Sequence, residues 1–141
     1  MGNLVSRRQF TIEWGYCDPA GIVFNSRFFE FFDWGTWILF EEALGVKPQN
    51  LTGTLGIILP LVDVSVRFLA PTRFGDVVEL TSQVSEFRRS SFDVAHQLTV
   101  GGALTAEGRE SRVWAKRDTG DGAGIKALPI PADVIARFAT P

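Results

Sequence analysis

One carboxylate, Asp18, lies in the turn-like segment YCDPAG, directly before an aromatic run that is typical of a buried helix. Aspartate before proline is common in turns, so a turn-forming role alone would account for this residue. Asp18 also precedes Asn25, where the helix is expected to begin, by seven residues. A helix amino terminus offers free backbone N–H groups and a partial positive charge. A carboxylate beside such donors suits acyl transfer, because the acid can attack a carbonyl or activate water while a helix amide holds the oxyanion.

A second group of candidates lies in FRRSSF, residues 87–92, between two strand-like runs. Guanidinium groups bind phosphate oxygens in a forked geometry, and hydroxyl groups add neutral donors. Arg88, Arg89, Ser90 and Ser91 could therefore form a compact anion-binding turn. A phosphorylated small molecule is the ligand that this composition favours, and the competing interpretation is a solvated hairpin with ordinary surface arginines.

Asp33 is an acid inside the aromatic run, with Phe32 and Trp34 on either side. We expect its carboxylate to be partly buried and therefore to need a polar partner. Two partners remain open at this point. One is a polar contact across a subunit interface, and the other is a polar group on a bound ligand.

His96 is the only histidine, and it falls on the apolar face of its strand. This position predicts a histidine packed in the core or in an interface. Cys17 adjoins the turn acid but has no evident activating base, so it is interpreted as a packing residue. The spacing of the residues supports no serine–histidine–acid or cysteine–histidine grouping and no carboxylate–histidine metal site.

The hydrophobic periodicity indicates the elements that must position these residues. One long helix is expected from Asn25 or Ser26 to about Leu44, with Gly45 after its end. Gly35, in the middle of that helix, predicts the close approach of another backbone. A short helix is expected after Pro131, and residues 119–124 are expected to form a loop. Five strands are expected over residues 5–13, 62–68, 78–84, 92–100 and 103–117.

These elements predict an α+β fold in which an antiparallel five-stranded sheet wraps around one long central helix. Short connections make the four later strands antiparallel. The strand at 62–68 alternates apolar and polar residues and is expected to be half-buried. The helix is apolar nearly all round, which is typical of a helix buried on most sides. An exposed sheet edge and an apolar helix flank both favour dimerisation.

Composition sets the wider limits on function. The chain has 141 residues, which predicts a single domain over residues 1–141, with 45% hydrophobic and 21% charged residues. A net charge of −2 argues against nucleic-acid binding. One cysteine excludes an intramolecular disulfide and fits a reducing cytoplasm. No apolar run reaches the roughly 20 residues that a membrane helix needs, so we expect neither a membrane partner nor a secretory signal.

Three segments together resemble one family. EWGYCDPAGIVFNSRFFEFFD is similar to the acid-turn-helix motif of the hotdog-fold acyl-CoA thioesterases, specifically the 4-hydroxybenzoyl-CoA thioesterase branch. EFRRSSF resembles the phosphate-contacting turn of that branch, and LPIPADVIARF resembles its C-terminal segment. The order and spacing of the strands also agree, so the resemblance spans nearly the whole chain.

The resemblance implies a role for each matching position. Asp18 matches the catalytic carboxylate, which acts as nucleophile or general base on the thioester carbonyl. The backbone N–H of Asn25 matches the donor at the helix end that polarises this carbonyl. Asp33 matches an acid that meets the ring hydroxyl of a hydroxybenzoyl group. In the compared family member an aromatic residue stands where this chain has Asn25, which changes the pocket wall but keeps the backbone donor.

The resemblance also implies how coenzyme A is held. Arg88, Arg89 and Ser91, with Ser90, match residues that hold the phosphates, although Ser90 replaces a basic residue and should weaken this binding. The sites of the family form between subunits, which predicts a homodimer or a dimer of dimers, that is, a tetramer. Coenzyme A is part of the substrate, so no separate cofactor is expected.

The function expected from the sequence is therefore hydrolysis of an aromatic acyl-CoA, with 4-hydroxybenzoyl-CoA favoured. Two alternatives remain. The chain could be a thioesterase for short or branched aliphatic acyl-CoA, or a non-catalytic acyl-CoA-binding module. Asp33 distinguishes the aliphatic alternative from the aromatic one, because only a hydroxyl on an aromatic acyl group gives Asp33 a group to bind.

Overall fold

The computed structural model describes residues 3–117 and 124–139, so most of the loop expected at 119–124 lies outside the described residues. No helix in these two ranges is long and apolar enough to cross a membrane. The elements, in chain order, are β1 (Ser6–Thr11), a 3-10 turn (Trp14–Tyr16), α1 (Ser26–Leu44), α2 (Pro48–Gly53), β2 (Ile57–Ile58), β3 (Leu61–Phe68), β4 (Val77–Phe87), β5 (Ser91–Val100), β6 (Ala103–Val113), β7 (Ala115–Arg117), β8 (Ile125–Ala127) and α3 (Ala132–Phe138).

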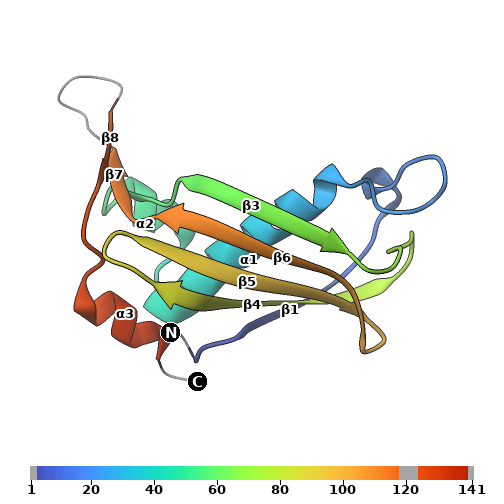
Figure 1. The fold of residues 1–141 in the computed structure, drawn as a ribbon. Helices are drawn as coiled ribbons and strands as arrows, with labels where there is room; N and C mark the ends of the chain where they lie inside the picture. The colour runs from blue at the N-terminus through green and yellow to red at the C-terminus, as the bar shows by residue number, and fades with distance from the viewer. Residues whose placement is uncertain (1–2, 118–123, 140–141) are drawn as a thin grey trace.

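The main sheet has five antiparallel strands in the order β1-β4-β5-β6-β3, which confirms the predicted architecture (Figure 1). Strands β5 and β6 form a tight hairpin through Gly101 and Gly102, which have φ angles of 57° and 83°. Two consecutive positive φ angles match the twist of paired strands, and glycine adopts them without steric cost.

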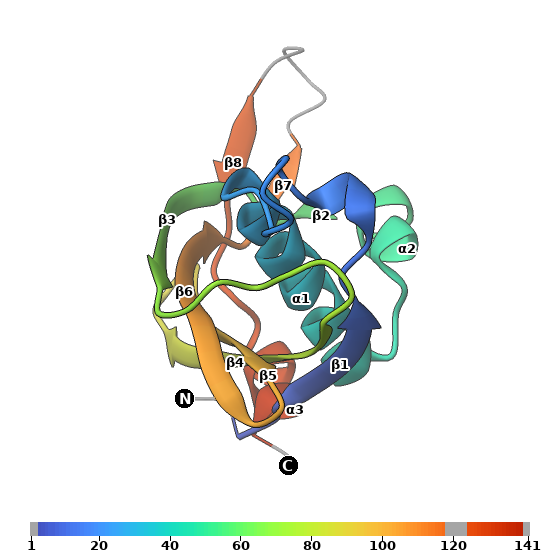
Figure 2. The same ribbon diagram turned by 90° about the vertical axis from the view of Figure 1, so that its right-hand side faces the viewer.

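The sheet curves around α1, as the view along the helix shows (Figure 2). The helix begins and ends where the sequence predicts, and Gly45 closes it in the left-handed conformation at φ 68°. Its apolar side chains divide the core into two clusters, one towards each end of the helix. Phe31, Phe32 and Leu39 are completely buried. The aromatic run is therefore the centre of the core.

Gly35 does mark a close approach, but side chains of β4 approach it rather than a backbone. A Cβ atom added to Gly35 would lie 2.5 Å from the Ser82 hydroxyl oxygen and 3.1 Å from a Leu80 methyl group. The prediction of a close approach at Gly35 is therefore confirmed, but the prediction that a backbone approaches it is wrong. The missing side chain allows the helix to rest directly on β4.

The strand β3 differs from its prediction, because most of it is exposed rather than half-buried. The sequence alternation is present, and Val64 and Val66 are partly covered. Val62, however, is 62% exposed, and Phe68 is also exposed. The physical reason is position: β3 is the outermost strand beside β6, and α1 covers only part of its inner surface. The chain leaves β3 through residues 69–76 and crosses to β4 near the other edge, instead of forming a hairpin.

A second, small sheet closes one end of the molecule. It has the order β2-β7-β8, and the sequence did not indicate β2, β8 or α2. The predicted strand at 103–117 is interrupted at Trp114, whose side chain is buried in the core cluster at that end of α1. The helix α3 packs against the same cluster through Phe138, at the position predicted after Pro131.

Candidate active site

The turn around Asp18 is held by three hydrogen bonds. Its carboxylate Oδ1 accepts from the Ala20 amide at 2.8 Å, its carbonyl accepts from the Gly21 amide, and its own amide donates to Ile22. Gly21 takes a φ angle of 80°, which a residue with a side chain adopts rarely. Within residues 3–117 and 124–139, no donor reaches Oδ2 of Asp18. The turn therefore fixes the acid and leaves one of its oxygens available.

The amino terminus of α1 carries unpaired donors. The backbone amides of Asn25 and Ser26 have no acceptor in the part of the chain that the structure describes. Asn25 already has helical dihedral angles, φ −55° and ψ −35°, and its side chain makes no capping hydrogen bond there. The helix therefore begins at the residues that the sequence predicts, but without a side-chain cap. Free amides at a helix start are suited to hold a developing negative charge.

A cavity of about 550 Å³ brings the turn and the helix start together. Asp18 and Asn25 both line it, as the sequence predicted from their short separation. Its remaining wall is mainly apolar, and the rings of Phe28 and Phe68 meet edge to face with centroids 5.1 Å apart. An acid and a residue with a free amide in the wall of one apolar cavity suit an acyl group that reacts at its carbonyl. The other lining residues are Ile22, Val23, Phe24, Leu69, Ala70, Pro71 and Thr72.

Asp33 lies outside this cavity, two helical turns beyond Asn25. At 1.5 Å per residue, the two positions are about 12 Å apart along the helix axis. As predicted, the Asp33 carboxylate is partly buried and has a partner, but that partner belongs to the same chain. Arg112 Nη2 donates to Asp33 Oδ1 at 2.6 Å. A single chain therefore does not bring Asp33 to Asp18.

Arg112 belongs to a buried polar network that sequence reasoning missed. Glu110 accepts from Arg112 Nη2 at 2.8 Å and lies 3.0 Å from His96 Nε2, while Thr36 of α1 donates to the same carboxylate. On the other side of the ring, the Ser82 hydroxyl lies 2.7 Å from His96 Nδ1. The sequence held no alternation that could have marked this network, because residues 107–112, EGRESR, are polar or glycine on both faces of β6.

His96 is 1% exposed, which confirms the prediction of a core histidine. The structure links Ser82, His96 and Glu110 in line, a grouping that the spacing of these residues in the sequence did not support. All three side chains are buried, and none lines the cavity that contains Asp18. The grouping therefore holds α1 against the sheet and has no access to a substrate.

The pKa of Glu110 reflects this network. Burial raises the pKa, but hydrogen bonds from His96 and Arg112 together with the Arg112 charge hold it at about 2, below the ordinary 4.5. The same ion pair raises the pKa of Arg112 against the effect of its burial. Glu110 and Arg112 thus form a charged pair in the core at neutral pH.

The turn with Arg88, Arg89, Ser90 and Ser91 joins β4 to β5, as predicted. The Arg88 amide donates to the Ser91 carbonyl at 2.8 Å, which closes the turn. The carbonyls of Arg89 and Ser90 accept from backbone amides of the C-terminal half, those of Ile130 and Trp114. Among the described residues, the side chains of Arg89 and Ser90 make no hydrogen bond or ion pair and are available to a ligand.

Arg88, by contrast, is engaged within the chain. Its guanidinium donates to both oxygens of Asp93, and Arg109 and Ser111 also donate to this carboxylate. The hydrogen bond from Arg88 is the main cause of a pKa of Asp93 far below its usual range, although burial opposes it. The turn lies at the opposite end of the sheet from the Asp18 loop (Figure 1).

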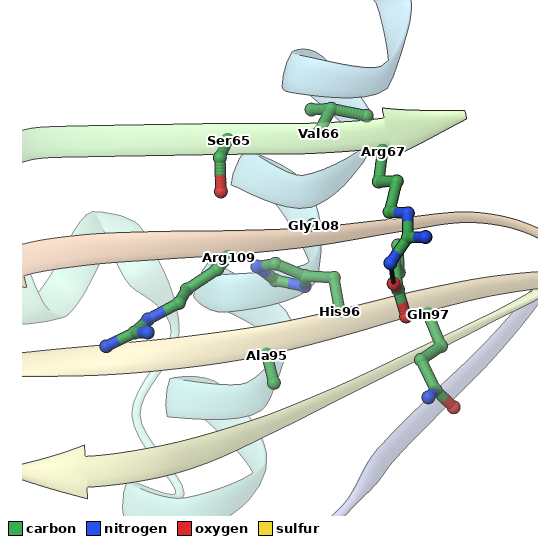
Figure 3. A pocket seen from close by; sticks show the side chains of 9 residues that line it. Ser65, Val66, Arg67, Ala95, His96, Gln97, Gly108 and Arg109 are labelled. Atoms are coloured by element: carbon green, nitrogen blue, oxygen red, sulfur yellow. Dashed lines mark ion pairs between the residues drawn. The ribbon is translucent and has the colours of Figure 1, made fainter. Parts of the chain in front are cut away.

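A smaller cavity of about 300 Å³ lies on the outer face of the sheet. Figure 3 shows Ser65, Gln97 and Arg109 around it, with the ion pair between Arg67 and Glu107 at 3.7 Å. The residues predicted for the site lie elsewhere. The charged residues around this hollow are already paired, Arg67 with Glu107 and Arg109 with Asp93. The hollow is also open, so it is a weaker candidate for a catalytic site.

Comparison with known proteins supports the functional assignment. The model of the thioesterase-like superfamily matches residues 12–138. The 4-hydroxybenzoyl-CoA thioesterase of Pseudomonas sp. strain CBS-3 is 32% identical over 136 residues, which cover 90% of this chain and 92% of that protein. The structure of that enzyme superposes with a TM-score of 0.82 at 30% identity, over 94% of this chain and 98% of the other.

Two further structures are similar over most of both chains. A gentisyl-coenzyme A thioesterase gives a TM-score of 0.81 at 29% identity, over 92% of this chain and 98% of the other. An Asp→Asn mutant of 4-hydroxybenzoyl-CoA thioesterase, complexed with 4-hydroxybenzoyl-CoA, gives 0.84 at 29%, over 96% and 99%. The chain therefore belongs to the thioesterase-like superfamily, and it is a thioester hydrolase with the hotdog fold.

Proposed function

We propose that this chain hydrolyses aromatic acyl-CoA thioesters, with 4-hydroxybenzoyl-CoA favoured, to the free acid and coenzyme A. The observation that carries the proposal is the cavity that Asp18 shares with Asn25, whose backbone amide has no acceptor among the described residues. The similar proteins support the acyl class, because 4-hydroxybenzoyl and gentisyl groups are both hydroxylated benzoyl groups. Coenzyme A arrives as part of the substrate, and the proposal requires no separate cofactor.

The proposed mechanism uses the free oxygen of Asp18. This oxygen either attacks the thioester carbonyl carbon or takes a proton from a water that attacks it. In the first route the C–S bond breaks as an acyl–aspartyl anhydride forms, and water then cleaves this anhydride to release the product acid and free Asp18. In the second route water adds directly to the carbonyl and the C–S bond breaks. In both routes the water supplies the proton that the leaving thiolate takes. The amide of Asn25 donates to the carbonyl oxygen as it becomes negative, and one such donor is typically worth about 3 kcal/mol in the barrier.

The proposal places the complete site between two chains. Two copies of β3 can pair antiparallel about a two-fold axis, which covers the exposed apolar side chains of this edge. Such pairing sets the Leu61 end of one strand beside the Phe68 end of the other. Phe68 lines the Asp18 cavity, and Leu61 is paired in register with Arg112, the partner of Asp33. Asp33 of one subunit would then face the acyl ring that is bound by the other.

The antiparallel pairing of two β3 strands also supports the proposed role of the anion-binding turn. The register places Ser91 opposite Val113, at the Leu61 end of the sheet, so the turn lies on the same side as Asp33. A second chain therefore brings its turn towards the Asp18 cavity of the first. We propose that Arg89, Ser90 and Ser91 contact phosphates of coenzyme A in a homodimer or a dimer of dimers, on a turn that the ion pair of Arg88 with Asp93 holds in place.

A panel of aromatic and aliphatic acyl-CoA esters, assayed by thiol release with the full chain, tests this function. We expect hydroxylated benzoyl esters to give the highest kcat/KM. Asp18→Asn should lower kcat by about 10²-fold or more, while Asp133→Asn, an exposed acid on α3, should keep it. Faster hydrolysis of short or branched aliphatic esters would assign the aliphatic alternative. Binding of every ester without turnover would assign a non-catalytic module.

A further inference from the structure

Arg112 is one of the few charged side chains buried in this protein, and it is held from three directions. Its side chain is 4% exposed. Nη1 donates to the Leu59 carbonyl at 2.9 Å, Nη2 and Nε donate to Glu110 at 2.8 Å and 3.3 Å, and Nη2 also donates to Asp33 at 2.6 Å. A guanidinium with these partners cannot rotate without breaking hydrogen bonds in the core.

Asp33 has the opposite character at its outer end. Its side chain is 47% exposed, and Arg112 occupies only Oδ1. Over residues 3–117 and 124–139, Oδ2 has no hydrogen-bond donor. The carboxylate is thus anchored through one oxygen and open through the other. A fixed acceptor of this kind distinguishes ligands by where their donors lie, because it cannot follow a misplaced donor.

The charges of Asp33, Glu110 and Arg112 also affect which ligands this acceptor favours. Glu110 and Arg112 form a buried pair whose formal charges cancel. The Asp33 carboxylate then contributes a further negative charge at the protein surface. Such a group favours a hydroxyl donor on a ligand and offers nothing to an unsubstituted ring or an alkyl chain.

We propose that Arg112 is a positioning residue for substrate selection, which fixes the Asp33 carboxylate so that its free oxygen accepts from the hydroxyl of a hydroxylated aromatic acyl group. The inference rests on the proposed function, because the acyl ring lies in the cavity of the neighbouring subunit. Arg112 itself does not touch the substrate. The competing interpretation is that Arg112 serves only the stability of the core.

The variant Arg112→Lys separates the two interpretations. Lysine keeps the positive charge beside Glu110. Its single ammonium group, however, lacks the planar fork of donors with which arginine reaches Leu59, Glu110 and Asp33 together. We would measure kcat and KM of the full chain with 4-hydroxybenzoyl-CoA and with benzoyl-CoA, and the thermal midpoint in parallel. The expected result is a KM for the hydroxylated ester that rises about tenfold, with kcat and the constants for benzoyl-CoA within about twofold. Arg67→Lys, on the outer face of the same sheet, is the matched control and should change neither ester.

Two further variants make the result decisive. Asp33→Glu keeps a carboxylate for Arg112 but moves its free oxygen, so it should also lose selectivity for the hydroxylated ester. The double variant of Arg112→Lys and Asp33→Asn should show the same selectivity for the hydroxylated ester as Asp33→Asn alone, because both changes remove the same contact.

The inference is overturned if folded Arg112→Lys keeps the selectivity of the wild type, or if it impairs both esters equally. If Arg112→Lys does not fold, unchanged selectivity in Asp33→Glu overturns it instead. Failure of the proposed function has another signature. In that case the unmodified chain hydrolyses no aromatic ester, or Asp33→Asn leaves the selectivity unchanged, before any change at Arg112.

Discussion

Arg88 and Asp93 form a two-bond ion pair, with Nη2 to Oδ2 at 2.6 Å and Nη1 to Oδ1 at 3.1 Å. The Asp93 side chain is fully covered, whereas the neighbouring Arg89 projects without a partner in the described part of the chain. The two adjacent arginines therefore have different tasks. Arg88 stabilises the hairpin, and Arg89 is the cation that a phosphate can engage without displacing a carboxylate.

We expect Arg89→Ala to raise KM for acyl-CoA esters by about tenfold without changing the thermal midpoint, because it removes one charged phosphate contact. Arg88→Ala should instead lower the urea midpoint of unfolding, because it takes a partner from a buried carboxylate. Steady-state kinetics and urea unfolding of the same two variants check the division. A larger KM effect from Arg88→Ala at unchanged stability would contradict it.

The buried Glu110 predicts a particular dependence of stability on pH. Its pKa is about 2 in the folded chain against an ordinary 4.5, so the folded form binds the proton less readily than the unfolded form. The stabilisation is complete above pH 4.5 and is lost as the pH falls towards 2. Glu110→Gln should cost about 3 kcal/mol at pH 7, and the difference from the wild type should shrink below pH 4.

Urea midpoints of the wild type and Glu110→Gln between pH 2.5 and 7 provide this measurement. Glu107→Gln is a suitable control, because Glu107 lies on the outer face of β6 and its ion pair with Arg67 is exposed. Its cost should be below about 1 kcal/mol at every pH. A constant difference between wild type and Glu110→Gln across the range would show that the charge of Glu110 is not the source of its stabilisation.

The contact of α1 with β4 predicts the effect of filling Gly35. In an open helix, Gly35→Ala would stabilise by about 1 kcal/mol. Here the new Cβ meets the Ser82 hydroxyl, which is itself held by His96, and a Leu80 methyl group. The variant should therefore be less stable by about 1–3 kcal/mol. Gly53→Ala is the matched control, because a Cβ on Gly53 in α2 meets no atom within 4 Å. Chemical denaturation compares the two, and equal stability would refute the close contact.

The exposed edge of β3 predicts that Val62 supports self-association. Val62→Lys places a charge on the edge that two copies of the strand would share, so it should shift the chain to monomer and lower kcat/KM by about tenfold or more. Val77→Lys, at a half-exposed valine of β4 away from this edge, should keep the oligomeric state. Light scattering after size exclusion measures both variants. Full activity in a monomeric Val62→Lys chain would refute a site built from two subunits.

The sequence predicted the placement of those candidate residues that lie close together in the chain. Asp18 and Asn25 are joined by one turn, and the cluster from Arg88 to Ser91 is a single hairpin, so local rules suffice for both. The pair of Asp33 and Arg112 could not be predicted in this way. These residues are 79 positions apart and meet only because α1 lies under β6, next to the edge strand β3.

The same limit explains the errors about β3 and Gly35. Alternation shows that one face of a strand is apolar, but it does not show whether a helix or a second chain covers that face. Val62 has the pattern of a core residue and the exposure of an interface residue. Likewise, a glycine in a helix indicates a close neighbour, and only the strand order shows that the neighbour is Ser82.

The backbone bonds from Ile130 and Trp114 to the carbonyls of Arg89 and Ser90 tie the hairpin turn at residues 88–91 to the last segment of the chain. Asp18, Asn25 and Asp33 all lie within the first third of the sequence. Under the proposed function, the hairpin for the carrier and Arg112, which anchors Asp33, both depend on β6 and the chain after it. Exchanging this later part between relatives should therefore alter both the preference for the thiol carrier and the acyl selectivity, whereas Asp18 and the helix start, which the exchange leaves in place, should still support hydrolysis.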